Sequence, residues 1–168
     1  MNEVEQFVRR WNGVAAGTVA LMRALPDGQY DFRPDAGARS IGELAWHLAE
    51  IDGYISFGIA NRTFSSGEKP PNIVRPRTVQ ELAPGYEQVH REAIARIESL
   101  RPDELDEQIQ SFDGAWMTIR DMLWNRVLLH AAHHRGQLGV LCRLAGGVAP
   151  SVAGPNREDD VRRRAAAG

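Results

Sequence analysis

Four long segments of the chain repeat their apolar residues every three or four positions, and proline or glycine residues interrupt the chain after each segment. The segments run from about residue 2 to 25, from 40 to the proline-rich stretch 62–77, from 78 to about 101, and from about 118 to 145. This spacing is typical of α-helices that bury one face. No segment shows a convincing strand pattern. The chain is therefore predicted to be all-α and to fold as a four-helix bundle.

Three of the expected helices begin at residues that cap helix amino termini. Ser40 and Glu43 have the spacing of a capping box, in which two side chains and two backbone amides bond reciprocally, and Thr78 and Glu81 repeat that spacing. Thr118 stands three residues before an aspartate in a similar arrangement. These residues predict where the second, third and fourth helices start.

Two connections between the expected helices are unusually long. Residues 62–77 and 101–117 exceed the ~2–8 residues that commonly join the helices of a bundle. Long connections often carry function. These two could cover one end of the bundle.

Size and charge exclude several classes of protein. At 168 residues the chain is expected to form one domain, with a bundle over residues 1–155 and a tail or short helix over 156–168. A net charge of −2 provides no basic face for nucleic acid, and a single cysteine, Cys142, excludes an internal disulfide. Neither a run of ~18 apolar residues nor a secretory signal pattern is present. We therefore expect no membrane partner and a cytoplasmic location.

Three of the five histidines lie within positions 130–134, in the sequence HAAHHRGQL. An α-helix turns about 100° per residue, so His130 and His134 point about 40° apart, on the line of apolar residues of the fourth helix. His133 falls on the shoulder of that line. Two histidines at this spacing can bind one metal ion, or they can be hydrogen-bonded across the core without one.

A further histidine, His47, lies on the second helix, in the sequence AWHLAEIDGY. Its direction is about 80° from the centre of that helix's apolar stripe, so it could face either the bundle interior or solvent. Together with His130 and His134 it would form a three-histidine site with room for water or a substrate. Glu43 and Glu50 lie one turn before and after His47 and could orient it or add an oxygen ligand. Capping by Glu43 and solvent exposure of Glu50 are the simpler interpretations.

Metalloprotease motifs are excluded by the same residues. A zincin helix requires a glutamate directly after the first histidine, where this chain has Ala131. In the inverted motif the glutamate position is occupied by His133. A peptidase is therefore not expected, and His133 is interpreted as a residue at the edge of the bundle.

Other side chains have simple explanations or stay open. Cys142 faces away from the histidines and is expected to pack in the core. Arg135 could bind an acidic group, although an ion pair at the surface or helix end is the simpler expectation. His90 has no histidine nearby in sequence, and Asp52 and Tyr54 could line a pocket. The tryptophans are expected in the core or at a dimer contact: Trp11, Trp46, Trp116 and Trp124.

Two blocks of sequence resemble the DinB/YfiT-like superfamily. RSIGELAWHLAEIDGY (39–54) resembles the segment with the family's first metal histidine, and LLHAAHHRGQLGVLCRLAGGVAP (128–150) contains the hallmark HxxxHRGQ. The likeness extends over about residues 1–155. It implies a four-helix bundle of the DinB/YfiT-like type, usually a homodimer, with a divalent ion bound by His47, His130 and His134.

The resemblance also implies a chemistry. Relatives carry out metal-dependent transfers and isomerisations that use low-molecular-weight thiols. We therefore expect a thiol-dependent transferase or related metalloenzyme that acts on a small electrophile, with Zn²⁺ or Ni²⁺ as the leading ions and Mn²⁺ or Fe²⁺ as further candidates. The thiol would have to come from outside the chain, because Cys142 faces away. The alternative is a non-catalytic bundle, used for dimerisation or stress-related binding, whose histidines hold a structural ion or none.

Overall fold

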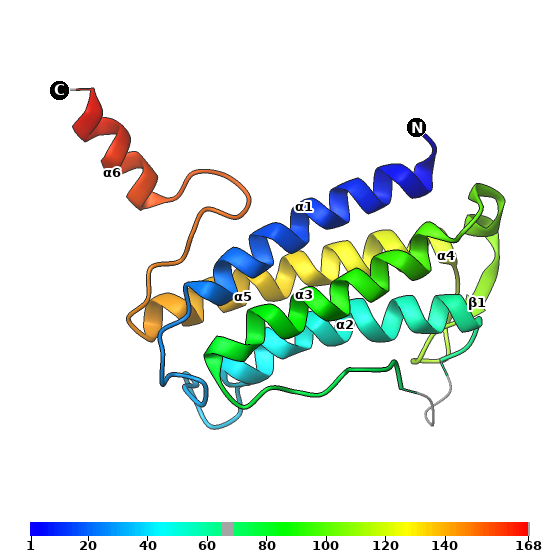
Figure 1. The fold of residues 1–168 in the computed structure, drawn as a ribbon, viewed down its shortest axis with the longest axis horizontal. Helices are drawn as coiled ribbons and strands as arrows, with labels where there is room; N and C mark the ends of the chain where they lie inside the picture. The colour runs from blue at the N-terminus through cyan, green and yellow to red at the C-terminus, as the bar shows by residue number, and fades with distance from the viewer. Residues whose placement is uncertain (65–68, 168) are drawn as a thin grey trace.

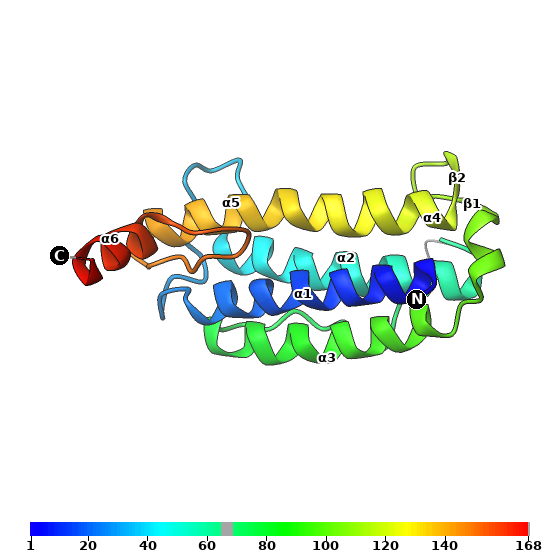
Figure 2. The ribbon, with the colours of Figure 1, turned by 90° about the horizontal axis from the view of Figure 1, so that it is seen from above.

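The computed structural model describes residues 1–64 and 69–167 and shows four long helical segments packed side by side (Figures 1 and 2). The first three are α1 (Glu3–Arg23), α2 (Ile41–Asn61) and α3 (Val79–Glu98). The fourth begins with α4 (Ile119–Asp121), continues through the π-helical segment η2 (Met122–Leu129), and ends with α5 (His130–Leu144). The predicted all-α four-helix bundle with long connections is confirmed.

The core lies between the four segments and contains apolar side chains from each of them. Phe7, Trp11 and Trp46 are among the largest fully buried side chains. Burial of each large apolar side chain contributes about 1.5–3 kcal/mol to folding. Two of the four tryptophans therefore lie in the core, as expected, whereas Trp116 is exposed and Trp124 is half-buried.

The predicted helix starts are largely correct. Ser40 and Glu43 form the reciprocal capping box, with the Ser40 amide donating to Glu43 Oε2 at 2.7 Å and the Glu43 amide donating to Ser40 Oγ at 3.2 Å. The hydroxyl of Thr118 accepts from the amide of Asp121. The box expected at Thr78 does not form: the Thr78 side chain accepts no backbone hydrogen bond, and its hydroxyl donates to the Glu81 carboxylate at 2.7 Å.

The connection between α3 and α4 contains structure that the sequence pattern did not indicate. A short 3₁₀ helix, η1 (Pro102–Asp106), leads into a hairpin of β1 (Gln108–Gln110) and β2 (Trp116–Thr118). The strands are antiparallel, with Ile109 opposite Met117. Strands of three residues are too short for an alternating pattern to be recognised.

The last helix, α6 (Arg157–Ala166), stands away from the bundle (Figure 1). It buries no residue, and an ion pair between Arg143 and Glu158 at 2.7 Å connects it to α5. Residues 156–168 were expected to form a tail or short helix, and α6 forms within this range. Over the residues that the structure describes, no helix is long and apolar enough to cross a membrane.

Candidate metal centre

Three histidines from two helices meet at one point of the bundle. His47 lies on α2, and His130 and His134 lie one turn apart on α5, all of them half-buried. Their ligand nitrogens all lie within 4.8 Å of one another. The His47 ring is 5.4 Å from the His130 ring and 4.6 Å from the His134 ring, between centroids. The histidines named from the sequence therefore converge, and among the described residues this cluster consists of these three side chains.

Two histidines of the cluster have a second partner that holds the ring. His47 Nδ1 lies 3.3 Å from Glu50 Oε2, and His134 Nδ1 lies 2.7 Å from Gln137 Oε1. The Arg126 backbone near His130 raises the pKa of its ring, against the larger lowering by burial. Metal-binding histidines typically donate one ring N–H to such an acceptor, which leaves the other nitrogen unprotonated. Glu50 is thus half-buried and contacts the His47 ring rather than being exposed to solvent, whereas Glu43 serves as a helix cap.

The Nε2 atoms of His130 and His134 face each other. The two Nε2 atoms are 2.8 Å apart. When both rings carry their proton on the other nitrogen, two lone pairs point at the same small space. A cation placed there would remove the repulsion between them. The donor set therefore fits a metal ion.

The electrostatics of the cluster favour neutral imidazoles. Burial lowers the pKa of His130, and the nearby His47 lowers it further. Burial also lowers the pKa of His134 to about 4, against the opposing effect of its hydrogen bond to Gln137. Both rings are therefore neutral at pH 7, which is the form that binds a metal ion.

The residues of α5 that face the core are not those that the α-helical wheel predicted. The most buried line runs through Ala131, Arg135, Leu138 and Cys142, while His130 and His134 lie beside it, half-buried. The cause is η2, because a π turn bonds residue i to i+5 and contains one residue more than an α turn. A wheel of about 100° per residue therefore misplaces the core line across this segment by one residue.

Arg135 is buried, which differs from its expected position at the surface. It was expected in a surface ion pair, but it is 7% exposed, and its Nη1 donates to the carbonyl of Val14 at 2.9 Å. The shift of the core line explains this position. His133, by contrast, is exposed at the edge of the bundle, as expected.

Asp52 and His90 belong to a separate polar cluster inside the bundle. Asp52 is 1% exposed and accepts hydrogen bonds from Trp11 Nε1 at 3.1 Å and from the Tyr86 hydroxyl at 2.9 Å. His90 Nδ1 lies 2.8 Å from the same carboxylate, and its Nε2 lies 3.2 Å from Asn12 Oδ1. Burial and the Asp52 charge raise the pKa of Tyr86 well above its usual value. These contacts join α1, α2 and α3, and His90 is not part of the histidine cluster.

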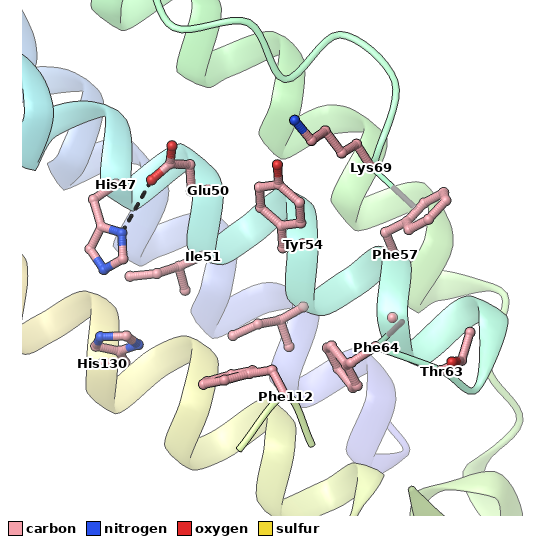
Figure 3. A pocket seen from close by; sticks show the side chains of 12 residues that line it. His47, Glu50, Ile51, Tyr54, Phe57, Thr63, Phe64, Lys69, Phe112 and His130 are labelled. Atoms are coloured by element: carbon pink, nitrogen blue, oxygen red, sulfur yellow. Dashed lines mark hydrogen bonds and ion pairs between the residues drawn. The ribbon is translucent and has the colours of Figure 1, made fainter. Parts of the chain in front are cut away.

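A cavity of about 480 Å³ opens beside the histidine cluster (Figure 3). His47 and His130 line one end of it, and α2 residues continue along its length to Gly58. Tyr54 lines it, as was considered from the sequence. Phe64 and Phe112 come from the two long connections, which therefore do cover this part of the bundle. Sequence reasoning missed both phenylalanines, and only the unusual length of their loops pointed to them.

Cys142 is fully buried and lies away from the cluster. Its Sγ lies 3.4 Å from the carbonyl of Ala24, and burial raises the pKa of its thiol. Packing in the core, as expected, is its role. The protein therefore offers no thiolate of its own to the histidine cluster among the described residues.

The fold and the cluster together define a class of protein: a helical bundle with three histidines from two helices beside a cavity. Residues 10–138 match the DinB superfamily, and the chain belongs to that superfamily. The chain is 27% identical over 159 residues to the Bacillus subtilis protein YrdA. This alignment covers 93% of this chain and 91% of YrdA.

Solved structures confirm the fold. The DinB-like protein YjoA from Bacillus subtilis has a TM-score of 0.71 at 22% identity, over 88% of this chain and 96% of that one. A DinB-like protein from Bacillus cereus has a TM-score of 0.72 at 24% identity, over 88% and 95%. At these identities the likeness concerns the fold alone.

Proposed function

We propose that the protein binds one divalent metal ion at His47, His130 and His134 and catalyses a thiol-dependent transfer or isomerisation of a small electrophile. The observation that carries this proposal is the convergence of three imidazoles whose ligand nitrogens lie within 4.8 Å of one another. Zn²⁺ and Ni²⁺ are the leading ions, with Mn²⁺ and Fe²⁺ as further candidates, because neutral imidazoles accept several first-row metals.

The metal ion, when bound, would supply positive charge that favours the thiolate form of a substrate thiol. The protein's own residues have distinct tasks around it. Glu50 orients the His47 ring through Nδ1, and Gln137 does the same for His134. The thiol is a separate small molecule, because Cys142 is buried in the core. A homodimer in the cytoplasm is part of the same proposal.

The cavity favours a catalytic role over a purely structural ion. A structural site is typically closed by protein ligands, whereas a catalytic site keeps a position open to water or substrate. Here two of the three histidines line a cavity large enough for a small molecule. A reactant in that cavity would lie directly beside the cluster.

Metal analysis of matched variants tests the ligand assignment. The wild-type protein should retain about one metal ion per chain after dialysis. His130→Ala and His134→Ala should lose most of it while their circular dichroism stays helical. His133→Ala is the matched control, since that residue lies on the same helix, is exposed, and should retain full occupancy. Full occupancy in both ligand variants would overturn the assignment.

Turnover assays test the reaction. A panel of low-molecular-weight thiols and electrophiles should reveal at least one pair that the metal-loaded protein converts. His130→Ala should abolish that turnover and His133→Ala should preserve it. A protein that binds its metal tightly but converts no pair would instead support a structural ion.

A further inference from the structure

The cavity beside the histidine cluster has aromatic walls from two separate loops. Phe64 follows α2, and Phe112 lies in the turn of the β1–β2 hairpin. Their ring centroids are 6.3 Å apart at an interplanar angle of 72°, an edge-to-face pair. Figure 3 shows both rings facing the same space as Ile51 and His130. The two loops thus meet across the cavity.

Both rings are held in place by contacts of their own. A Cβ atom at position 58 would lie 2.3 Å from Phe64 Cε1, so the glycine there allows the ring to lie against α2. The Arg126 guanidinium lies 5.7 Å from the centroid of the Phe112 ring and also pairs with Asp113 at 2.7 Å. Phe112 itself is 62% exposed, which places it at the mouth of the cavity.

The rest of the lining divides into an apolar and a polar part. Ile51 and Ile55 of α2 continue the apolar surface. Glu50, Tyr54 and Lys69 also line the cavity, and Figure 3 draws Phe57 on the same side as Tyr54 and Lys69. A highly polar ligand would lose hydration inside the apolar part without gaining hydrogen bonds. A flat ring would instead gain edge-to-face contacts with the phenylalanines.

We infer that this cavity binds an uncharged compound with an aromatic ring, packed against the Phe64–Phe112 pair with its reactive end toward His47 and His130. Phe64 and Phe112 are then specificity-determining residues. The inference rests on the proposed function for the identity of this compound as the electrophile. The binding itself depends only on the cavity and can be measured without metal.

Titration of the full-length, metal-free protein with 2-naphthol tests the inference. Isothermal titration calorimetry should show saturable binding of one 2-naphthol per chain. Phe112→Ala and Phe64→Ala should each weaken it by about tenfold, which corresponds to about 1.4 kcal/mol. Trp116→Ala is the matched control, because this exposed tryptophan belongs to the same hairpin but does not line the cavity, and its affinity should stay within about twofold of wild type. Cyclohexanol, a ring without π electrons, should bind more weakly than 2-naphthol.

The outcomes separate this inference from the proposed function. Absence of saturable binding, or an equal loss of affinity in Trp116→Ala and Phe112→Ala, would overturn the inference even if the protein binds metal and is active. Tight 2-naphthol binding by a protein that binds no metal would leave the inference standing and refute the proposed function. Since Phe112 is largely exposed, its replacement should not unfold the protein, and the thermal melt of each variant checks this.

Discussion

At the scale of single residues, the structure contains two polar clusters of different character. The histidine cluster is half-buried and borders a cavity, as a ligand site should. The Asp52 carboxylate is buried, and it is hydrogen-bonded to Trp11, Tyr86 and His90. Buried polar groups of the second kind stabilise a fold only while every partner is present.

Replacement of Asp52 should therefore be costly. In Asp52→Ala, Trp11 and Tyr86 lose their acceptor and His90 loses its charged partner, so the free energy of unfolding should fall by about 3–5 kcal/mol. Asp52→Asn, which keeps the side chain's shape and one oxygen, should lose only about 1–3 kcal/mol. Chemical denaturation monitored by circular dichroism measures both.

An exposed aspartate provides the comparison for Asp52. Asp103 has a side chain that is 73% exposed, and Asp103→Ala should leave the unfolding free energy close to the wild-type value. Equal effects at the two positions would show that the buried hydrogen bonds do not stabilise the bundle.

Sequence patterns predicted one of these clusters and not the other. His130 and His134 stand one turn apart, and a resemblance to known sequences added His47, so the three histidines of the cluster could be named in advance. Asp52 and His90 are 38 positions apart in the sequence, and no local spacing connects them. Contacts of this kind depend on how α2 and α3 pack, which the sequence of either helix alone does not reveal.

At the scale of elements, η2 determines which residues of the fourth helical segment face the core. It contains about one residue more per turn than an α-helix. The buried residues before η2 and those after it therefore do not follow one continuous α-helical spacing. The sequence gives no direct sign of a π segment, and an α-helical wheel consequently placed the core line one residue too early. The helix itself, its start at Thr118 and its end near Leu144 were nevertheless predictable.

Deletion of one residue from η2 should convert it toward a regular α-helix and preserve the faces on both sides. Deletion of Asn125, which is exposed, should therefore leave metal occupancy close to the wild-type value. Deletion of Ala132, between His130 and His134, should remove most of the metal, because it rotates His134 by about 100° relative to His130. Elemental analysis after dialysis compares the two. Loss of metal from a folded Asn125 deletion would contradict this account of η2.

At the scale of the whole molecule, the bundle has a buried core, whereas α6 does not pack into it. α6 buries no residue, whereas the segment before it is attached to the bundle. Ala149 is 6% exposed, and Val152 packs partly against the core, next to Gly17 of α1. The sequence placed the end of the bundle near residue 155, and this division remains a prediction.

Truncation tests that division. A chain that ends at residue 155 loses the Arg143–Glu158 ion pair, and its melting temperature should fall by no more than about 2–4 °C. A chain that ends at residue 148 also loses Ala149 and Val152 and should melt at a clearly lower temperature. Equal melting temperatures for the two truncations would place the boundary earlier in the chain.

The position of Phe64 and Phe112 on loops has a consequence for how proteins of this shape diversify. The helices carry the histidines and the core, while the aromatic walls come from connections whose length and composition can change with little effect on packing. Insertions or substitutions there would alter which molecules fit, and the imidazoles would stay where they are. One scaffold could in this way bind different small molecules by exchanging two short stretches of surface chain.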